Sequence, residues 1–443
     1  ASLRARPPGR RGREPGDLAD RLALRCVEGA DGELLLTRQV DPARGVVVAF
    51  DGEIDVVVEE APRVYRRLRV ADGWRFVAVR ENQDFDFRRR VAAAIDAGAA
   101  WVRAAVEADE SFLADRRGER NYGSGRLALA LLAMLHGHVA PADPVVQRGF
   151  ATLRRRRIDD AYSLAAALMA MAALHERAPL GDADGGRVEA WLGRMLDCVD
   201  PRTRPDELLR FNYTRGPRFD TSLQQYGLLG MRAAQRCGVA VPETAFAAAA
   251  RHLVEVQGTA GGRRRLALTS HAQVHAALGT ERPPDAELVR ARSRGFAYQR
   301  ADEPPFGSMT AAGVSGLLLA RAGMASQGVA DRALGRDVDA AIHDGFAWLA
   351  EHLSLRVNPG DPERADNHWA YWLYCLERCC ELHRVAWLDG RDWYYEGGLQ
   401  LLSAQRPDGA FRARHAATLL LDSTCFAVLF LAKASAAGPI TGR

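Results

Sequence analysis

The stretch "RRIDDAYSLAAALMAMAAL" (Arg156–Leu174) sets two aspartates before a segment that is apolar on every side of a helix. A helix without a polar face has to be surrounded by protein. Segments of this kind recur along the chain, and between them lie helices with one charged face, whose apolar residues follow a three-and-four spacing. The sequence therefore predicts two sets of helices, one inside the other.

Six inner helices alternate with outer ones, which predicts an all-α fold, an (α/α)6 barrel or toroid. In such a barrel the N-termini of the inner helices point to the same end of a central cavity. The long interval ahead of the fourth inner helix contains residues 258–293, which we interpret as an inserted loop over one mouth. The six predicted inner segments begin near Asn121, Ile158, Phe219, Ser308, Asp366 and Asp422.

The first 87 residues differ from the rest. Residues 1–20 are rich in Pro, Gly and Arg, and such a composition cannot offset the entropy of ordering, so a flexible arm is predicted. Residues 21–87 contain short β-branched runs separated by turn residues, which predicts a small β-rich element of three or four strands. The barrel is then expected over 88–443.

Composition excludes several classes of protein. The formal net charge is only +4, and no aromatic residues interleave the basic clusters, so nucleic-acid binding is not expected. The seven cysteines are scattered, which favours free thiols. No apolar run reaches the roughly 18–20 residues that span a bilayer, which predicts a soluble protein without a transmembrane segment. The first residue is alanine, which fits an exported and a cytoplasmic protein equally well.

Aspartates recur at the predicted starts of the inner helices: Asp159-Asp160, Asp220, Asp366 and Asp422. A carboxylate there accepts the free N–H groups of the first turn and is stabilised by the helix dipole. The recurrence predicts capping. Because all the N-termini share one mouth, these residues are also predicted to line a binding pocket. The neighbouring side chains predicted to line it with them are Tyr122, Tyr162, Tyr226, His368, Tyr371 and Phe426.

One segment carries a resemblance to a known family. The sequence "GGLQLLSAQRPDGAF" (Gly397–Phe411) resembles the Gln-Trp repeat of squalene and hopene cyclases, with Gln405, Gly409 and Phe411 at the positions of Gln, Gly and Trp. "GSMTAAG", "DNHWAYWLYCLERC" and "RDWYYEGGLQLLSAQ" resemble bacterial proteins with a prenyltransferase/squalene-oxidase repeat domain of unassigned activity. The resemblance covers roughly residues 88–435 and implies the fold of terpenoid cyclases and protein prenyltransferases.

The resemblance to cyclases implies an acid. Class II cyclases protonate an isoprene with the middle acid of an Asp-x-Asp-Asp motif. "RIDD" matches the last two acids, which makes Asp159 and Asp160 the candidate catalytic residues, but Arg157 stands where the first aspartate belongs. A cation there favours ionised carboxylates and disfavours acid catalysis.

The resemblance to prenyltransferases implies a zinc site, which the sequence fills only in part. Asp366 and His368 match the first two ligand positions, and Ser423 stands where the last histidine belongs, with Cys425 nearby. An Asp and a His alone do not complete a tetrahedral site. No metal or cofactor is therefore predicted.

The sequence thus predicts a central apolar cavity for a small hydrophobic ligand of isoprenoid type, with catalysis left open. One alternative is a non-catalytic scaffold that holds a protein partner. Another is a glycan-acting enzyme that uses Asn121, Tyr122, His368 and Tyr371. An open apolar cavity with an exposed acid favours the first hypothesis, a ring plugged by side chains the second, and an open polar groove the third.

Overall fold

The computed structural model shows a mostly helical chain, and thirteen helices and nine strands lie in its described part. The chain divides into two compact units: residues 1–92 with 275–285, and residues 93–274 with 286–443. The predicted arm, 1–20, lies outside the described residues. The structure describes residues 24–28, 34–38, 48–49, 54–61, 64–70, 75–76, 79–109, 122–277, 284–362, 365–366, 368–413 and 419–433, with side chains from Phe87 onward except at 275–277.

The described strands of the first unit form three antiparallel pairs. Six strands therefore stand where three or four were predicted, in agreement with a β-rich element. The longest pair is a hairpin whose register sets Ile54 opposite Val70. The pairs are β1 (Leu24–Glu28) with β2 (Leu34–Arg38), β3 (Val48–Ala49) with β6 (Arg75–Phe76), and β4 (Ile54–Ala61) with β5 (Val64–Val70).

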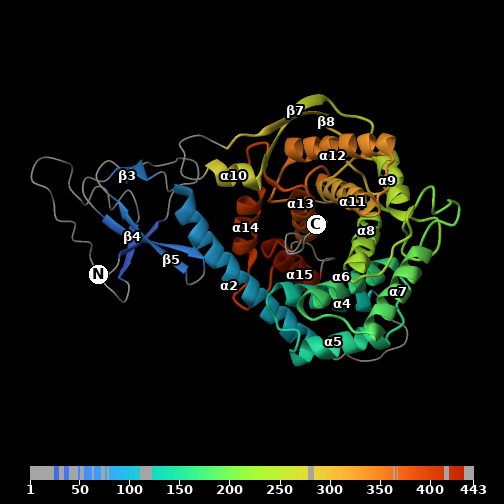
Figure 1. Cartoon of the computed structure of the whole chain (residues 1–443), viewed down its shortest axis with the longest axis horizontal. Coiled ribbons are helices and arrows are strands. Elements are labelled where there is room, and N and C mark those ends of the chain that lie inside the picture. Colours follow the sequence, from blue (N-terminus) through green and yellow to red (C-terminus); the bar gives the residue numbers. More distant parts are fainter. Residues whose placement is uncertain are drawn as a thin grey trace, which may run out of the picture. The chain divides into compact units, whose positions relative to one another are not determined.

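The second unit is built around six helices that pack in a closed cycle (Figure 1). Each helix contacts the next, and the last contacts the first. These helices are the segments that are apolar on every side, and each begins within three residues of its predicted start. They are α4 (Gly123–His136), α6 (Ala161–Arg177), α8 (Thr221–Arg236), α11 (Gly307–Ser326), α13 (Trp369–Leu382) and α15 (Leu420–Leu431).

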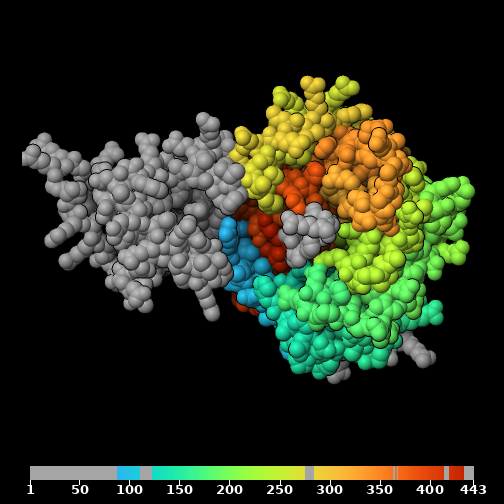
Figure 2. Space-filling model, in the orientation of Figure 1, coloured from blue at the N-terminus to red at the C-terminus, as the bar shows by residue number. Residues whose placement is uncertain are grey.

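Amphipathic helices pack against this cycle from outside. Figure 1 shows α5, α7, α9 and α12 outside it, and in Figure 2 the colours pass around the second unit in chain order. On α12 the apolar residues at three-and-four spacing, Val338, Ile342, Phe346 and Leu349, are almost fully shielded from solvent. The helices of this kind are α2 (Val79–Ala108), α5 (Pro144–Arg155), α7 (Asp182–Asp197), α9 (Ala245–Val256), α12 (Arg332–His352) and α14 (Trp393–Ala404). None of the described helices is both long and apolar enough to cross a membrane.

The segment predicted as an inserted loop is structured. It forms β7 (Arg263–Ser270), α10 (His271–Ala277) and β8 (Glu287–Arg292). β7 lies between β8 and β9 (Val385–Leu388) in an antiparallel sheet that packs against α12. Alternation explains the strand, since Leu266 and Leu268 are buried while the arginines before them are not. The predictions of a purely helical second unit and of a loop over its mouth are therefore wrong here.

Two corners of the second unit have the same construction, and we call them glutamine–phenylalanine corners. Gln257 ends α9 and Gln405 ends α14, with backbone angles of φ −65°, ψ 136° and φ −70°, ψ 136°. Each glutamine makes an isolated backbone bridge to a phenylalanine, Phe296 and Phe411 respectively. The two corners are an internal repeat that the structure makes visible.

Side-chain hydrogen bonds hold both corners in place. The Nε2 atom of Gln257 donates to the carbonyl oxygen of Ala341 at 2.9 Å, and that of Gln405 to the carbonyl oxygen of Ala94 at 2.9 Å. The backbone N–H of each phenylalanine donates to a threonine hydroxyl of the following inner helix, Thr310 or Thr424, at 3.0 Å. Each corner therefore ties two outer helices to one inner helix.

Candidate functional site

The inner helices run in the same direction, so the cycle has two chemically different ends. Residues of the first two turns contact one another, as Tyr162 contacts Tyr226 and Arg126 contacts Asp422. Residues of last turns, such as His136 and Arg236, meet around a separate pocket. We call these the N-terminal end and the C-terminal end of the ring.

The aspartate pair that opens α6 serves the helix. Asp160 is the N-cap and accepts a hydrogen bond from the backbone N–H of Ser163 at 2.8 Å. Asp159 is exposed, and its two carboxylate oxygens accept from Nε of Arg157 at 3.0 and 2.9 Å. Both candidate catalytic carboxylates thus have partners: Asp160 accepts from the helix backbone, and Asp159 accepts from Arg157.

Asp220 has the same function at α8 but is buried. It is 2% exposed and accepts from the N–H of Leu223 at 2.8 Å and from the hydroxyl of Ser222 at 2.5 Å. Burial raises the pKa of Tyr213 and of Tyr298, and the nearby charge of Asp220 raises both further. This carboxylate therefore lies among tyrosine hydroxyls at the N-terminal end.

Four partly exposed tyrosines, Tyr122, Tyr162, Tyr213 and Tyr298, form what we call the tyrosine face. Tyr122 is 42% exposed, and its ring centroid lies 6.0 Å from that of Tyr162 and 5.7 Å from that of Tyr213. It has a left-handed backbone, φ 57°, which is uncommon for a residue other than glycine. A strained backbone conformation at Tyr122 therefore holds its aromatic ring at the surface.

The loops that carry the other two rings are anchored to helix N-termini. The carbonyl oxygen of Tyr213 accepts from the N–H of Ala161 at 2.8 Å, and that of Tyr298 from the N–H of Thr221 at 2.9 Å. Sequence reasoning missed both tyrosines because they lie in irregular connections, where no periodicity marks them.

Behind this face, the interior of the ring is filled by side chains from opposite helices. Tyr162 stacks on buried Tyr226 with centroids 4.1 Å apart, and its hydroxyl donates to that of Tyr226 at 2.9 Å. The amide oxygen of Gln225 accepts from the hydroxyl of Tyr371 at 3.0 Å, and its Nε2 donates to the hydroxyl of Ser315 at 2.7 Å. These contacts connect α8 to α6, α11 and α13.

Phe426 completes the filling from α15. Its ring centroid lies 5.3 Å from that of Tyr371 and 5.0 Å from that of Tyr374. The predicted aromatic residues of the mouth therefore lie together but pack on one another, whereas His368 is exposed. The cavity found at the other end of the ring has a volume of about 50 Å³.

The residues that the resemblance placed in a zinc site differ in their exposure to solvent. Asp366 and His368 are exposed ahead of α13, whose N-cap is His368 without a side-chain capping bond, so the prediction that Asp366 caps this helix is wrong. Cys425 is buried within α15. In the described part of the chain no three His, Cys, Asp or Glu side chains gather as a metal would require. Asn121 lies outside the described residues.

Asp422 is also not a cap, contrary to the prediction. It lies inside the first turn of α15, whose N-cap is Leu419. Its Oδ2 lies 3.4 Å from Nε of Arg126, and its Oδ1 is buried without a hydrogen-bond partner among the described residues. Burial raises the pKa of this carboxyl, against the opposing effect of Arg126. Asp422 thus combines a raised pKa with a carboxylate oxygen that has no hydrogen-bond partner among the described residues.

The sequence matches no family model, and it matches none of the curated proteins.

Proposed function

We propose that the second unit is an (α/α)6 toroid of the type found in terpenoid cyclases and protein prenyltransferases. The closed cycle of inner helices and the outer helices packed against it support this proposal. So do the glutamine–phenylalanine corners, one of which holds Gln405 and Phe411, the residues that resemble the Gln-Trp repeat.

We further propose that this toroid is a binding scaffold whose tyrosine face holds a protein partner. The observation that carries the proposal is the filled interior, in which Gln225 links three inner helices. Ligand pockets for small molecules typically have volumes of about 300–1,000 Å³, whereas the cavity at the C-terminal end measures about 50 Å³. Exposed aromatic rings on a rigid support are common at the centre of protein interfaces.

Photo-crosslinking tests the scaffold. A benzophenone amino acid replaces Tyr122 at the tyrosine face or, as the control, exposed Gln147 on outer helix α5. Both proteins are irradiated in an extract of the cells that make the chain. We expect one protein to be captured at position 122 and not at 147. Equal capture at both positions, or an isoprenoid lipid that co-purifies with the wild-type chain in native mass spectrometry, contradicts the proposal.

Asp422 supports a second candidate function, acid catalysis on an isoprenoid. A carboxyl with a raised pKa and a free oxygen beside aromatic rings is suited to protonate a double bond. This candidate predicts that wild-type protein converts squalene, that Asp422→Asn abolishes the conversion, and that Asp159→Asn leaves it unchanged. Wild-type protein that leaves squalene intact removes the candidate.

A further inference from the structure

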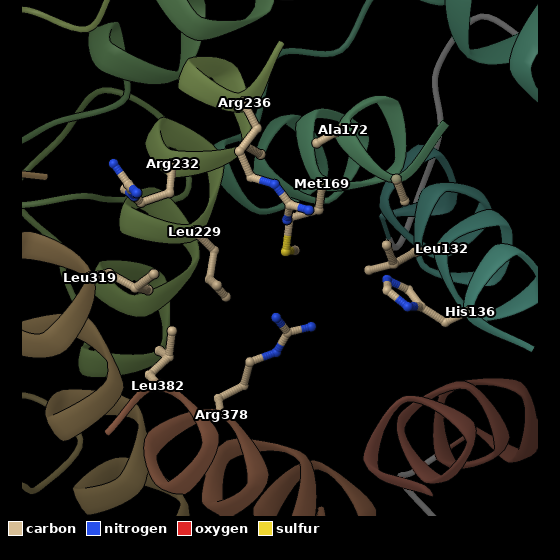
Figure 3. Close-up of a pocket in the computed structure, with 12 residues that line it drawn as sticks. Leu132, His136, Met169, Ala172, Leu229, Arg232, Arg236, Leu319, Arg378 and Leu382 are labelled. Atoms are coloured by element: carbon tan, nitrogen blue, oxygen red, sulfur yellow. The ribbon is translucent and has the colours of Figure 1, made fainter. Parts of the chain in front are cut away.

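The C-terminal halves of five inner helices, α4, α6, α8, α11 and α13, line a pocket at the C-terminal end of the ring (Figure 3). Its volume is about 50 Å³, and its lining combines apolar side chains with an unusual number of cationic ones. The lining residues that matter here are His136 of α4, Met169 of α6, Leu229, Arg232 and Arg236 of α8, and Arg378 of α13.

Arg378 is the most deeply buried of these cations. It is only 9% exposed, and Figure 3 shows its guanidinium directed into the pocket. Its Nε forms a long ion pair, 3.7 Å, with Oε2 of buried Glu377 and has no hydrogen-bond partner among the described residues. Its Cζ lies 4.8 Å from the ring centroid of Tyr374. A buried charged donor without an acceptor costs free energy, so this position favours an additional acceptor.

The other two arginines bring further positive charge to the same place. Figure 3 shows the guanidinium of Arg236 entering the pocket from the side opposite Arg378. Arg236 forms an ion pair with Glu176, whereas Arg232 has neutral partners, donating to Gln235 at 2.5 Å and to Ser326 at 3.3 Å. Burial lowers the pKa of Arg236, and the charge of Arg378 lowers it further. The guanidinium groups therefore repel one another.

Helix dipoles explain only part of this arrangement. Cations are stabilised by the carbonyl groups of a last helical turn, and Arg236 is the last residue of α8. That effect does not supply an acceptor for Nε of Arg378. The helix dipole also does not explain why the guanidinium groups of Arg236 and Arg378, which belong to different helices, line the same pocket.

We infer that this pocket binds an oxyanion of the phosphate type, either free phosphate or the phosphate group of an ester. This inference is independent of the proposed function, because it concerns the opposite end of the ring. Guanidinium groups match such oxygens in charge and in geometry. One water molecule needs about 10–15 Å³ of cavity volume on this measure, so a cavity of about 50 Å³ can accommodate an anion the size of phosphate.

His136 fits the same ligand. Burial, together with the charges of Arg378, Arg236 and Arg177, lowers its pKa to about 3. At neutral pH the imidazole is uncharged and offers one N–H donor to an anion. A bound anion favours the protonated ring, so the pKa of His136 should rise when the pocket is filled.

Calorimetry with inorganic phosphate tests the inference on the full chain. In phosphate-free buffer at pH 7.5, with ionic strength held constant by sodium chloride, we expect a Kd of about 1 mM or tighter. Arg378→Met and Arg236→Met should each weaken binding at least about tenfold. The matched control is Arg321→Met, since Arg321 of α11 pairs with Asp339 of α12 at 2.8 Å, outside the pocket. It should bind phosphate as the wild type does.

The same titration with O-phosphoserine separates the two sources of the anion. Tighter binding than inorganic phosphate indicates an ester, and weaker binding indicates the free ion. The inference is overturned if wild-type protein shows no saturable heat, or if folded Arg236→Met binds phosphate as tightly as wild type. Arg236 is 37% exposed, so this variant gives a result even where Arg378→Met fails to fold.

Discussion

At the scale of single residues, the most informative groups are ionisable side chains that are wholly or partly buried. Arg378 and His252 are buried and Asp422 is half-buried, and each has a buried atom without a hydrogen-bond partner among the described residues. Residue type and position do not reveal this from sequence. Arg378 lies within "CLERCC", where nothing in the sequence marks its surroundings, and Asp422 meets Arg126 from the far end of the chain. Only the packing of helices distant in sequence creates these surroundings.

His252 makes stability depend on pH. It is 1% exposed, and burial lowers its pKa to about 3, with a further contribution from Arg210. The unfolded chain binds a proton near pH 6.5, so the stability associated with neutral His252 is present above pH 6.5 and is lost as the pH falls toward 3. We expect this residue to account for about 2 kcal/mol of the loss in unfolding free energy between pH 7.5 and pH 5.

Urea unfolding at these two pH values tests the expectation. His252→Leu should lose about 2 kcal/mol less than wild type between pH 7.5 and pH 5. The comparison uses the change with pH within each protein, so an altered stability at pH 7.5 does not affect it. An equal loss in both proteins would show that His252 is protonated in the folded state.

At the scale of elements, local physical chemistry made the helices predictable. The capping carboxylates Asp160 and Asp220 were predicted from residue type alone, because short polar side chains satisfy first-turn N–H groups. The rule was wrong at α13 and α15. There His368 and Leu419 precede the first turn, and neither side chain makes a capping bond. Tertiary packing decides those two starts.

The aspartate pair gives a direct test of capping. Asp160→Ala should lower the unfolding free energy by about 1 kcal/mol, since it removes the hydrogen bond to Ser163. Asp159→Ala is the matched control, because an exposed ion pair such as that with Arg157 contributes about 0–1 kcal/mol. Thermal or urea unfolding of the two variants measures the difference. A larger effect at Asp159 would show that the two roles are reversed.

The glutamine–phenylalanine corners make a second prediction for elements. Gln257→Leu and Gln405→Leu each leave a buried carbonyl, that of Ala341 or Ala94, without this donor. We expect each change to cost about 1–3 kcal/mol of unfolding free energy. The sequence revealed only the corner at Gln405, because an insertion separates Gln257 from Phe296. Two unequal effects, one near zero, would show that the corners are not equivalent.

At the scale of the whole chain, alternation of helix types predicted the nested helices of the second unit but not what fills them. Six apolar helices can enclose an open cavity or a plug, and the choice depends on side chains such as Gln225 and Phe426 meeting across the ring. The sheet of β7, β8 and β9 was also missed, since β9 comes from a segment far along the chain.

Closure of the ring is the central claim, and a double-mutant cycle on Arg126 and Asp422 tests it most directly. These residues lie on the first and the last inner helix, and their side chains are 3.4 Å apart. Unfolding free energies are measured for wild type, Arg126→Met, Asp422→Asn and the double variant. A closed ring predicts a coupling energy of about 0.5–1 kcal/mol, whereas strictly additive effects would contradict the contact between α4 and α15.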